Sequence, residues 1–165
     1  MFAEVSKPCV LHVVPSLHPA AGGPSRTVTQ LVDALAGAGG LNVTLLSQGV
    51  PGEPAVQPQA TEVSCRICNS ASRQMLRLGL PVRTELVRIA RQSPPSLIHN
   101  NGLWQPANHW AASTARRFGI PLVVQPHGML EPWALQEKAL KKRLGMALFQ
   151  RRDLATPKVL VATSA

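Results

Sequence analysis

Five consecutive residues have the types and spacing to hold an anion: Gly22, Gly23, Pro24, Ser25 and Arg26. The two glycines tolerate positive φ and let the backbone approach a ligand closely, and proline suits the first position of a helix. The free N–H groups at such a helix start attract negative charge, and the arginine adds a fixed cation. We interpret the stretch as a diphosphate site. A plain strand-to-helix turn is the alternative, because neither Gly-x-Gly-x-x-Gly nor a P-loop sequence is present.

His127 is the second candidate, since it ends an apolar stretch and is followed by glycine. A neutral imidazole there can donate to, or accept from, a substrate hydroxyl. The alternative is a histidine satisfied by the backbone of a turn. Glu131, just before Pro132, could accept a hydrogen bond from a sugar hydroxyl or only favour the start of a helix. His12, inside the first apolar run, is expected to be a satisfied core or edge histidine.

No other constellation carries chemistry. Cys65 and Cys68 form a lone C-x-x-C, with no second pair to complete a four-ligand zinc site. The eight acidic residues include no obvious general acid/base pair, and no metal triad appears. We therefore expect neither a metal nor a resident cofactor.

The elements that must position these residues alternate between short apolar runs and helical patterns. The expected strands are residues 9–14, 42–46, 61–67, 96–102, 120–128 and 158–165, and the expected helices are residues 24–38, 82–92, 104–118 and 134–150. This alternation predicts an α/β fold with one doubly wound, Rossmann-like parallel sheet and helices on both faces. Ligands bind outside the carboxyl ends of such strands, which selects the loops 15–23, 48–58, 100–105 and 125–133.

The last expected helix carries two kinds of surface. Apolar residues at helical spacing are expected to pack on the core: Leu135, Ala139, Leu144, Ala147 and Leu148. Basic residues cluster elsewhere on it: Lys138, Lys141, Lys142 and Arg143. A solvated face is the simpler interpretation of the basic cluster. A strip resting on anionic lipid headgroups is the other, with each cation contributing ~1 kcal/mol.

The bulk composition limits the partners. The 165 residues suit one domain, and a net charge of +9 favours an anionic partner such as a nucleic acid, a membrane face or a phosphorylated small molecule. Aromatic residues make up 4% and tyrosine is absent, which argues against nucleic acid bound by base stacking. No signal peptide or apolar run of ~20 residues is visible. With three cysteines that cannot all pair, we expect a cytoplasmic chain, peripheral on the inner membrane.

Two long stretches resemble the N-terminal half of family 4 glycosyltransferases, which are retaining enzymes of GT-B fold. The first is "VLHVVPSLHPAAGGPSRTVTQLVDALAGAG", and the second is "LIHNNGLWQPANHWAASTARRFGIPLVVQPHGMLEPWAL". The resemblance continues through a basic helix to "LVATSA" and covers nearly all of residues 1–165. It implies a single acceptor-side domain of an enzyme that builds lipopolysaccharide, capsule or exopolysaccharide chains.

The resemblance also implies roles for the candidate residues. Residues 22–26 would approach the donor's diphosphate and the transferred sugar, and His127 would be the active-site histidine. The acceptor side of the cleft would hold Asn100, Asn101, Trp104 and Glu131. The basic cluster would face the membrane. Asn101 departs from relatives that carry a second histidine there.

A second departure concerns the donor-nucleotide domain. Relatives place that pocket in a second Rossmann-like domain with a Glu-x₇-Glu motif, which is absent from the sequence. We therefore expect negligible transfer from these residues alone, and a separate C-terminal half as a partner. The other partners would be a nucleotide-sugar donor, a glycan or lipid-linked acceptor and an anionic membrane. The alternative is a non-catalytic membrane-adhering or scaffold fragment of the same fold.

Overall fold

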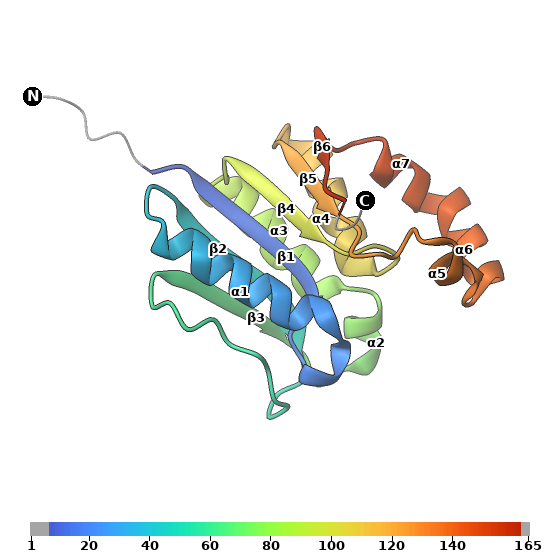
Figure 1. Ribbon diagram of the computed structural model, residues 1–165, viewed down its shortest axis with the longest axis horizontal. Helices are drawn as coiled ribbons and strands as arrows, with labels where there is room; N and C mark the ends of the chain where they lie inside the picture. Colours follow the sequence, from blue (N-terminus) through green and yellow to red (C-terminus); the bar gives the residue numbers. More distant parts are fainter. Residues whose placement is uncertain (1–6, 163–165) are drawn as a thin grey trace, which may run out of the picture.

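Six parallel strands form one sheet in the order β3-β2-β1-β4-β5-β6 (Figure 1). The computed structural model describes residues 7–162 of the 165. The strands are β1 Cys9–Ser16, β2 Asn42–Gly49, β3 Val63–Asn69, β4 Leu97–Asn101, β5 Leu122–Gln125 and β6 Val159–Leu160. The order reverses between β1 and β4, as in a doubly wound sheet, so the predicted fold class is confirmed. Of the last expected strand, residues 163–165 lie outside the described residues.

Helices cover both faces of the sheet. The first helix, α1 (Gly23–Gly37), packs on one face of β1 and β2 through a core that includes Val28, Val32 and Leu45. On the other face, α3 (Leu80–Gln92) and α4 (Pro106–Phe118) bury a larger core that includes Leu86 and Ile98. The α4 helix begins two residues later than expected, because Trp104 lies at a φ of 67° and cannot continue a right-handed helix.

The connection from β2 to β3 contains no helix, as its proline and glycine content predicts. The Asp33 carboxylate of α1 fastens it by accepting from the backbone N–H groups of Gln59 and Ala60. The N–H of Val56 donates to the Leu17 carbonyl. Residues 69–80, which show no single pattern, form the short helix α2 (Arg73–Arg77) and a left-handed turn at Gly79 that precedes α3. Hydrogen bonds thus hold the β2–β3 connection against α1 and the loop after β1.

The single helix expected over residues 134–150 is wrong. The chain forms α5 (Pro132–Gln136), breaks where Lys138 takes a left-handed φ of 53°, and resumes as α6 (Ala139–Gly145). A π-helix, η2 (Met146–Gln150), and α7 (Arg151–Leu154) continue it directly. The Lys142 ammonium donates to the Ala134 carbonyl at the end of α5, which satisfies a backbone group that the break exposes.

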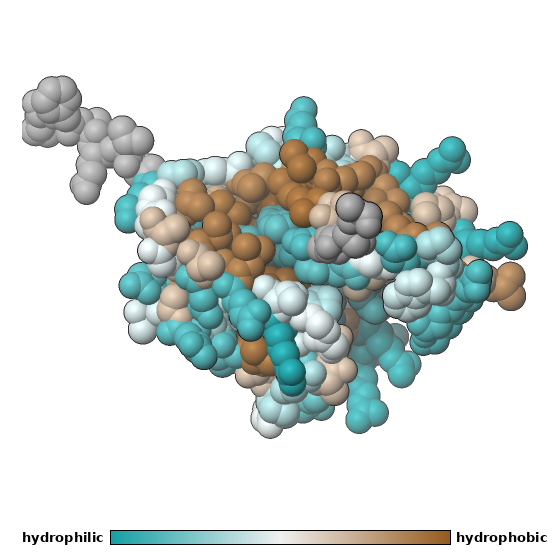
Figure 2. Space-filling model, viewed as in Figure 1, coloured by the Kyte–Doolittle hydropathy of each residue, from teal (hydrophilic) through white to brown (hydrophobic). Residues whose placement is uncertain are grey.

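The apolar face expected to pack on the core is also mispredicted. Leu144 and Leu148 are 61% and 71% exposed, and Leu140 is 82% exposed. Their spacing of four residues places them in one stripe along the helix. The π-helix instead turns Gln150 inward, where it is buried. Figure 2 shows an apolar surface in the upper part of the view, and β6 exposes Val159 and Leu160 at the edge of the sheet.

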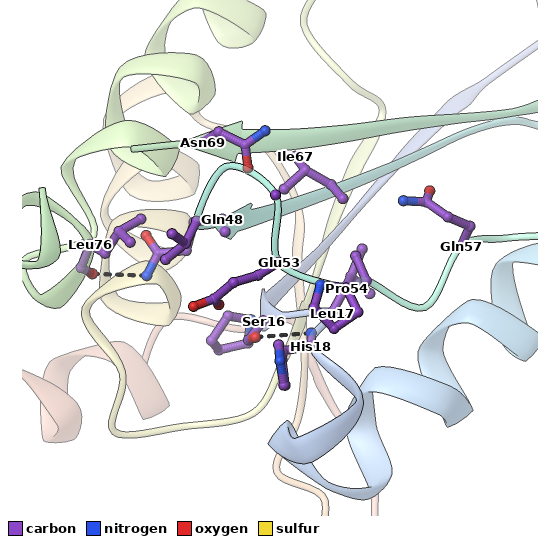
Figure 3. Close-up of a pocket in the computed structure, with 15 residues that line it drawn as sticks. Ser16, Leu17, His18, Gln48, Glu53, Pro54, Gln57, Ile67, Asn69 and Leu76 are labelled. Atoms are coloured by element: carbon purple, nitrogen blue, oxygen red, sulfur yellow. Dashed lines mark hydrogen bonds between the residues drawn. The ribbon is translucent and has the colours of Figure 1, made fainter. Parts of the chain in front are cut away.

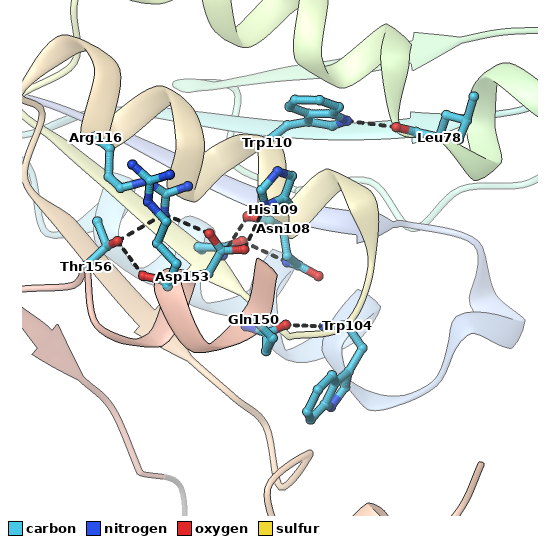
Figure 4. Close-up of polar contacts among 11 residues, drawn as sticks. Leu78, Trp104, Asn108, His109, Trp110, Arg116, Gln150, Asp153 and Thr156 are labelled. Atoms are coloured by element: carbon cyan, nitrogen blue, oxygen red, sulfur yellow. Dashed lines mark hydrogen bonds and ion pairs between the residues drawn. The ribbon is translucent and has the colours of Figure 1, made fainter. Parts of the chain in front are cut away.

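A buried polar cluster attaches α7 to α4 (Figure 4). The Asp153 carboxylate is 2.7 Å from Nη1 of Arg116 and 2.8 Å from Nδ1 of His109. Arg116 also donates to the Thr156 hydroxyl. The Gln150 side-chain oxygen accepts from the Trp104 backbone N–H at 3.0 Å. These contacts join the C-terminal helical segment to the loop that follows β4.

Candidate functional site

The carboxyl ends of β1, β4 and β5 meet at one edge of the sheet, because the three strands are parallel and adjacent. Neighbouring strands lie ~4.8 Å apart, so β1 and β5 are separated by ~10 Å. The loop after β1 leads to Gly22, and the loop after β5 contains His127. The two principal candidates from the sequence therefore follow strands that end at the same edge.

The glycine turn begins α1 in an unusual backbone conformation. Gly22 has φ 95° and ψ −161°, a region that only glycine enters without strain. The first turn of α1 has no side-chain cap and no acidic residue. The Ser25 hydroxyl is buried and donates to the Gly22 carbonyl at 2.8 Å, so it shapes the turn, while Arg26 is exposed. The first-turn N–H groups remain available to an anion.

His127 is held by Asn101. The Asn101 amide nitrogen donates to the carbonyls of Val13 and His99, which turns its oxygen toward His127 Nε2 at 3.3 Å. That nitrogen must therefore carry the imidazole proton, and Nδ1 keeps its lone pair for a ligand. Burial lowers the pKa of His127 below its ordinary value of 6.5, which favours the neutral ring. The residue also has a left-handed φ of 52°.

Two more histidines lie beneath this edge, in register on neighbouring strands. His12 of β1 and His99 of β4 have ring centroids 4.9 Å apart. The expectation of a satisfied His12 is wrong: it is 1% exposed, and neither ring nitrogen has a partner among the described residues. Burial, and then the neighbouring His99, lower the pKa of His12 to about 3. Burial, and then His127, lower the pKa of His99 to about 4.

The expected acceptor-side residues separate into two groups. Asn100 is buried on the α4 side of the sheet, where its oxygen accepts from the Asn108 amide at 2.7 Å. Trp104 links two loops, because its indole N–H donates to the Met129 carbonyl at 3.3 Å. Glu131 is exposed, and it lines a small cavity of about 140 Å³ together with His127 and Gly128. Asn101, Glu131 and His127 are thus the group that the structure brings together.

The expected basic strip is divided by the helix break. Lys138 lies at the break and its ammonium is 3.4 Å from the Glu137 carboxylate. Lys142 turns inward, with its ammonium 5.9 Å from the centre of the Trp104 ring. Lys141 and Arg143 are exposed beside the leucine stripe. Within residues 7–162, no helix is both long and apolar enough to cross a bilayer.

The sequence did not reveal the cavity of about 290 Å³ at the carboxyl ends of β1, β2 and β3 (Figure 3). Two of its walls are loops that the strand-end rule selects, residues 15–23 and 48–58. The side chains that face it carry no recognisable motif, and the strongest signal was the position of these loops. Cys65 and Cys68 point to opposite faces of β3, one in each core, so they cannot act together.

Comparison with known proteins gives one family and one fold. A family model described as a glycosyl transferase 4-like domain matches residues 22–165, which include residues 22–26, Asn101, His127 and Glu131. A sequence comparison with curated proteins finds no match.

Two solved structures share the fold at low sequence identity. One is from Listeria monocytogenes and is described as a UDP-N-acetylglucosamine 2-epimerase (TM-score 0.62, 10% identity, 96% of this chain covered). The other is the UDP-GlcNAc 2-epimerase of Methanocaldococcus jannaschii (TM-score 0.57, 8% identity, 94% covered). The present chain spans 39% of the length of each.

Proposed function

The chain belongs to the glycosyl transferase 4-like family, and we propose that it supplies one wall of the active site of a nucleotide-sugar-dependent glycosyltransferase. One observation carries the proposal. The Gly22 turn and His127 follow β1 and β5, whose carboxyl ends lie at one edge of the sheet on either side of β4. A diphosphate joined to a sugar is long enough to contact both.

Each group has a distinct role in this proposal. The diphosphate of the donor lies against the first-turn N–H groups of α1 and near Arg26, where the helix dipole favours negative charge. His127 accepts a hydrogen bond at Nδ1 from a hydroxyl of the transferred sugar. Asn101 is a positioning residue that holds the ring in the required tautomer. Glu131 lies beside the ring and would accept from a hydroxyl of the acceptor.

The proposed donor is a nucleotide sugar, which acts as a substrate rather than a resident cofactor. Support comes from the family match and from the two solved structures of the same fold, both described as UDP-N-acetylglucosamine epimerases. Among residues 7–162, no group of three potential ligands could hold a metal ion. The charge of the diphosphate would be met by backbone N–H groups and Arg26.

A second Rossmann-like unit would complete the site. The chain spans 39% of the length of the two solved structures, so most of each has no counterpart here. One wall positions a donor from one side only, and most of the orientation and charge stabilisation of a transfer reaction needs a closed site. We therefore expect negligible transfer from residues 1–165 alone, and transfer when a C-terminal half is supplied.

The exposed leucine stripe supports a location at a membrane surface. Leu140, Leu144 and Leu148 stand out from α6 and η2, and Lys141 and Arg143 lie between them in the sequence. A helix with exposed apolar residues and flanking cations binds in the interface of an anionic bilayer. This fits an acceptor that is lipid-linked or part of a growing cell-surface polysaccharide. The same stripe favours the second candidate function, a non-catalytic membrane-adhering or scaffold domain.

The two functions differ in what His127 does. If the chain forms one wall of a glycosyltransferase active site, His127→Ala should weaken the binding of UDP-N-acetylglucosamine about tenfold, which corresponds to one lost hydrogen bond. His127→Asn is the matched variant, because asparagine tolerates the left-handed backbone and leaves the turn unstrained. Calorimetric titration measures the affinity of the purified wild-type chain and of the two variants for UDP-N-acetylglucosamine. A scaffold would show no saturable binding in either the wild type or the variants.

A further inference from the structure

A groove between α3 and α4 is lined by four arginines. Arg83, Arg88 and Arg91 come from α3, and Arg117 comes from α4. The groove has a volume of about 480 Å³, and the described residues that line it include neither aspartate nor glutamate. Both helices cover the face of the sheet opposite α1, so the groove is separate from the Gly22 turn.

The arginines are spread along the groove rather than gathered at one end. Arg83 lies near the start of α3 and Arg91 in its last turn, and a rise of ~1.5 Å per residue separates their backbones by ~12 Å along the helix axis. A cation in the last turn of a helix interacts favourably with the helix dipole, which accounts for Arg91 and Arg117. The same dipole disfavours a cation near the start, so the helix itself gives no reason for Arg83.

Aromatic contacts from α4 orient two of the four side chains. The Arg83 guanidinium lies 4.7 Å from the centre of the Trp110 ring. Figure 4 shows that Trp110 is itself held, because its indole N–H donates to the Leu78 carbonyl at 2.7 Å. The Arg117 guanidinium lies 5.6 Å from the centre of the Phe118 ring. Contact with an aromatic ring positions a guanidinium and still leaves N–H groups for a ligand.

Three of the four arginines have no ion-pair partner within residues 7–162. The ion pairs of that part of the chain do not include Arg83, Arg91 or Arg117. Arg88 is paired, with its guanidinium 2.6 Å from the Glu85 carboxylate. Because like charges repel one another, an anion in the groove would lower the electrostatic free energy of the folded chain.

The groove suits an anion that carries several charges in a row. A guanidinium presents a planar fork of N–H donors that matches phosphate oxygens two at a time. Arginines whose backbones are ~12 Å apart present their charges along a line, which favours a chain of linked phosphates over a single phosphate ion. The volume of about 480 Å³ lies within the range of small-molecule sites, and Thr84 and Gln92 add polar groups to the wall.

From these features we propose that the α3–α4 groove binds an oligophosphate, that is, a chain of two or more linked phosphate groups. Such a chain occurs in nucleotides and in inorganic polyphosphates, and the groove offers the same guanidinium contacts to either source. The site goes beyond the proposed transferase function, because none of its lining residues belongs to the Gly22 turn or to the surroundings of His127.

The test is a titration of the ¹⁵N-labelled chain with orthophosphate, inorganic tripolyphosphate and adenosine triphosphate, in which the arginine Nε–H and Trp110 indole signals are observed. We expect the two oligophosphates to saturate shifts of Arg83, Arg91 and Trp110, and orthophosphate to bind at least about tenfold more weakly. Similar dissociation constants for the two oligophosphates would assign the affinity to the phosphate chain. Tighter binding of adenosine triphosphate would identify a nucleotide as the source.

Arg91→Gln should weaken the binding of tripolyphosphate about tenfold, because it removes one unpaired guanidinium. Arg73→Gln is the matched control, since it removes the same charge from an exposed position of α2 outside the groove. This variant should keep the wild-type dissociation constant. Both residues are exposed, so neither substitution should unfold the chain.

Three results would each overturn the inference: no saturable shift of the Arg83 and Arg91 signals, equal affinity for orthophosphate and tripolyphosphate, or an equal loss of tripolyphosphate affinity in the two variants. Cosedimentation with phosphatidylglycerol vesicles tests a lipid surface instead. If Arg91→Gln lowers vesicle binding while tripolyphosphate does not bind, the groove is part of a membrane surface and the inference is wrong.

Discussion

The Asn101 side-chain oxygen lies 3.3 Å from Nε2 of His127, while the Asn101 amide nitrogen is held by the carbonyls of Val13 and His99. One buried asparagine thus connects β1, β4 and the turn after β5. Because its orientation is fixed by two backbone acceptors, the imidazole has one favoured tautomer with the proton on Nε2. Asn101 thereby has a role in positioning His127.

Replacing Asn101 with alanine should release the tautomer of His127. The wild-type ring should be protonated at Nε2 in long-range ¹H–¹⁵N spectra, and the variant should show a mixture. The affinity for the nucleotide sugar should fall about tenfold. The free energy of unfolding should fall by about 1–3 kcal/mol, because the two backbone carbonyls lose the N–H groups that donate to them. An unchanged tautomer in Asn101→Ala would show that the contact does not orient the ring.

The two glycines before α1 should respond differently to alanine. A Cβ at either position meets no atom within 4 Å, but only Gly22 has a positive φ. Gly22→Ala should therefore cost ~1–3 kcal/mol of backbone strain and weaken donor binding. Gly23→Ala is the matched control and should remain close to wild type in both measurements. If Gly22→Ala and Gly23→Ala lower the free energy of unfolding in urea equally, the positive φ of Gly22 is not what the turn requires.

The sequence predicts the edge of the sheet that carries Gly22 and His127, because a single pattern is sufficient to locate the strands and their ends. Buried parallel strands are continuous apolar runs, as in Cys9–Ser16, and glycine and proline mark where they end. The order of elements then places Gly22 and His127 at one edge without any side-chain information. The fold class, and the common edge of Gly22 and His127, could therefore be predicted.

The failures share a physical cause. Helical spacing shows that Leu144 and Leu148 lie on one face, but it does not show what that face contacts, and here it contacts solvent. The break at Lys138 is accompanied by a hydrogen bond from Lys142 to the end of α5. The β1–β3 cavity depends on loops that meet only in the folded chain. Pairwise contacts of this kind leave no periodic pattern.

Acid should destabilise the fold through the buried histidines. The pKa of His12 is lowered to about 3 and that of His99 to about 4, while both titrate near 6.5 when unfolded. Below pH 6.5 the unfolded chain therefore binds more protons, and the free energy of unfolding falls as the pH falls toward 4. His12 alone should contribute a loss of roughly 3 kcal/mol by pH 4.

Urea unfolding at several pH values measures this loss. His12→Leu should reduce the slope of stability against pH and should not destabilise the protein at neutral pH, since it removes two unpaired buried nitrogens. A flat profile between pH 7 and 4 in the wild type would contradict the burial of uncharged His12.

Membrane binding should depend on the leucine stripe. Leu144→Ser with Leu148→Ser should reduce cosedimentation with anionic vesicles by about tenfold or more, because two exposed apolar side chains no longer enter the interface. Leu78→Ser is the matched control, since Leu78 is 49% exposed on another element. Vesicles without anionic lipid should bind less, as should the wild type at high salt. An equal loss of vesicle binding in Leu78→Ser and in the Leu144→Ser, Leu148→Ser variant would contradict a specific role for the leucine stripe.

In the proposed function, the Gly22 turn and His127 contact one ligand. Titration of the labelled chain with UDP-N-acetylglucosamine tests it most directly, with the amides of residues 22–26 and the His127 ring observed in the same spectra. Both sets of signals should shift with a single dissociation constant, and His127→Asn should weaken the response of both. Shifts confined to one of the two, or two sets that saturate at different concentrations, would contradict it.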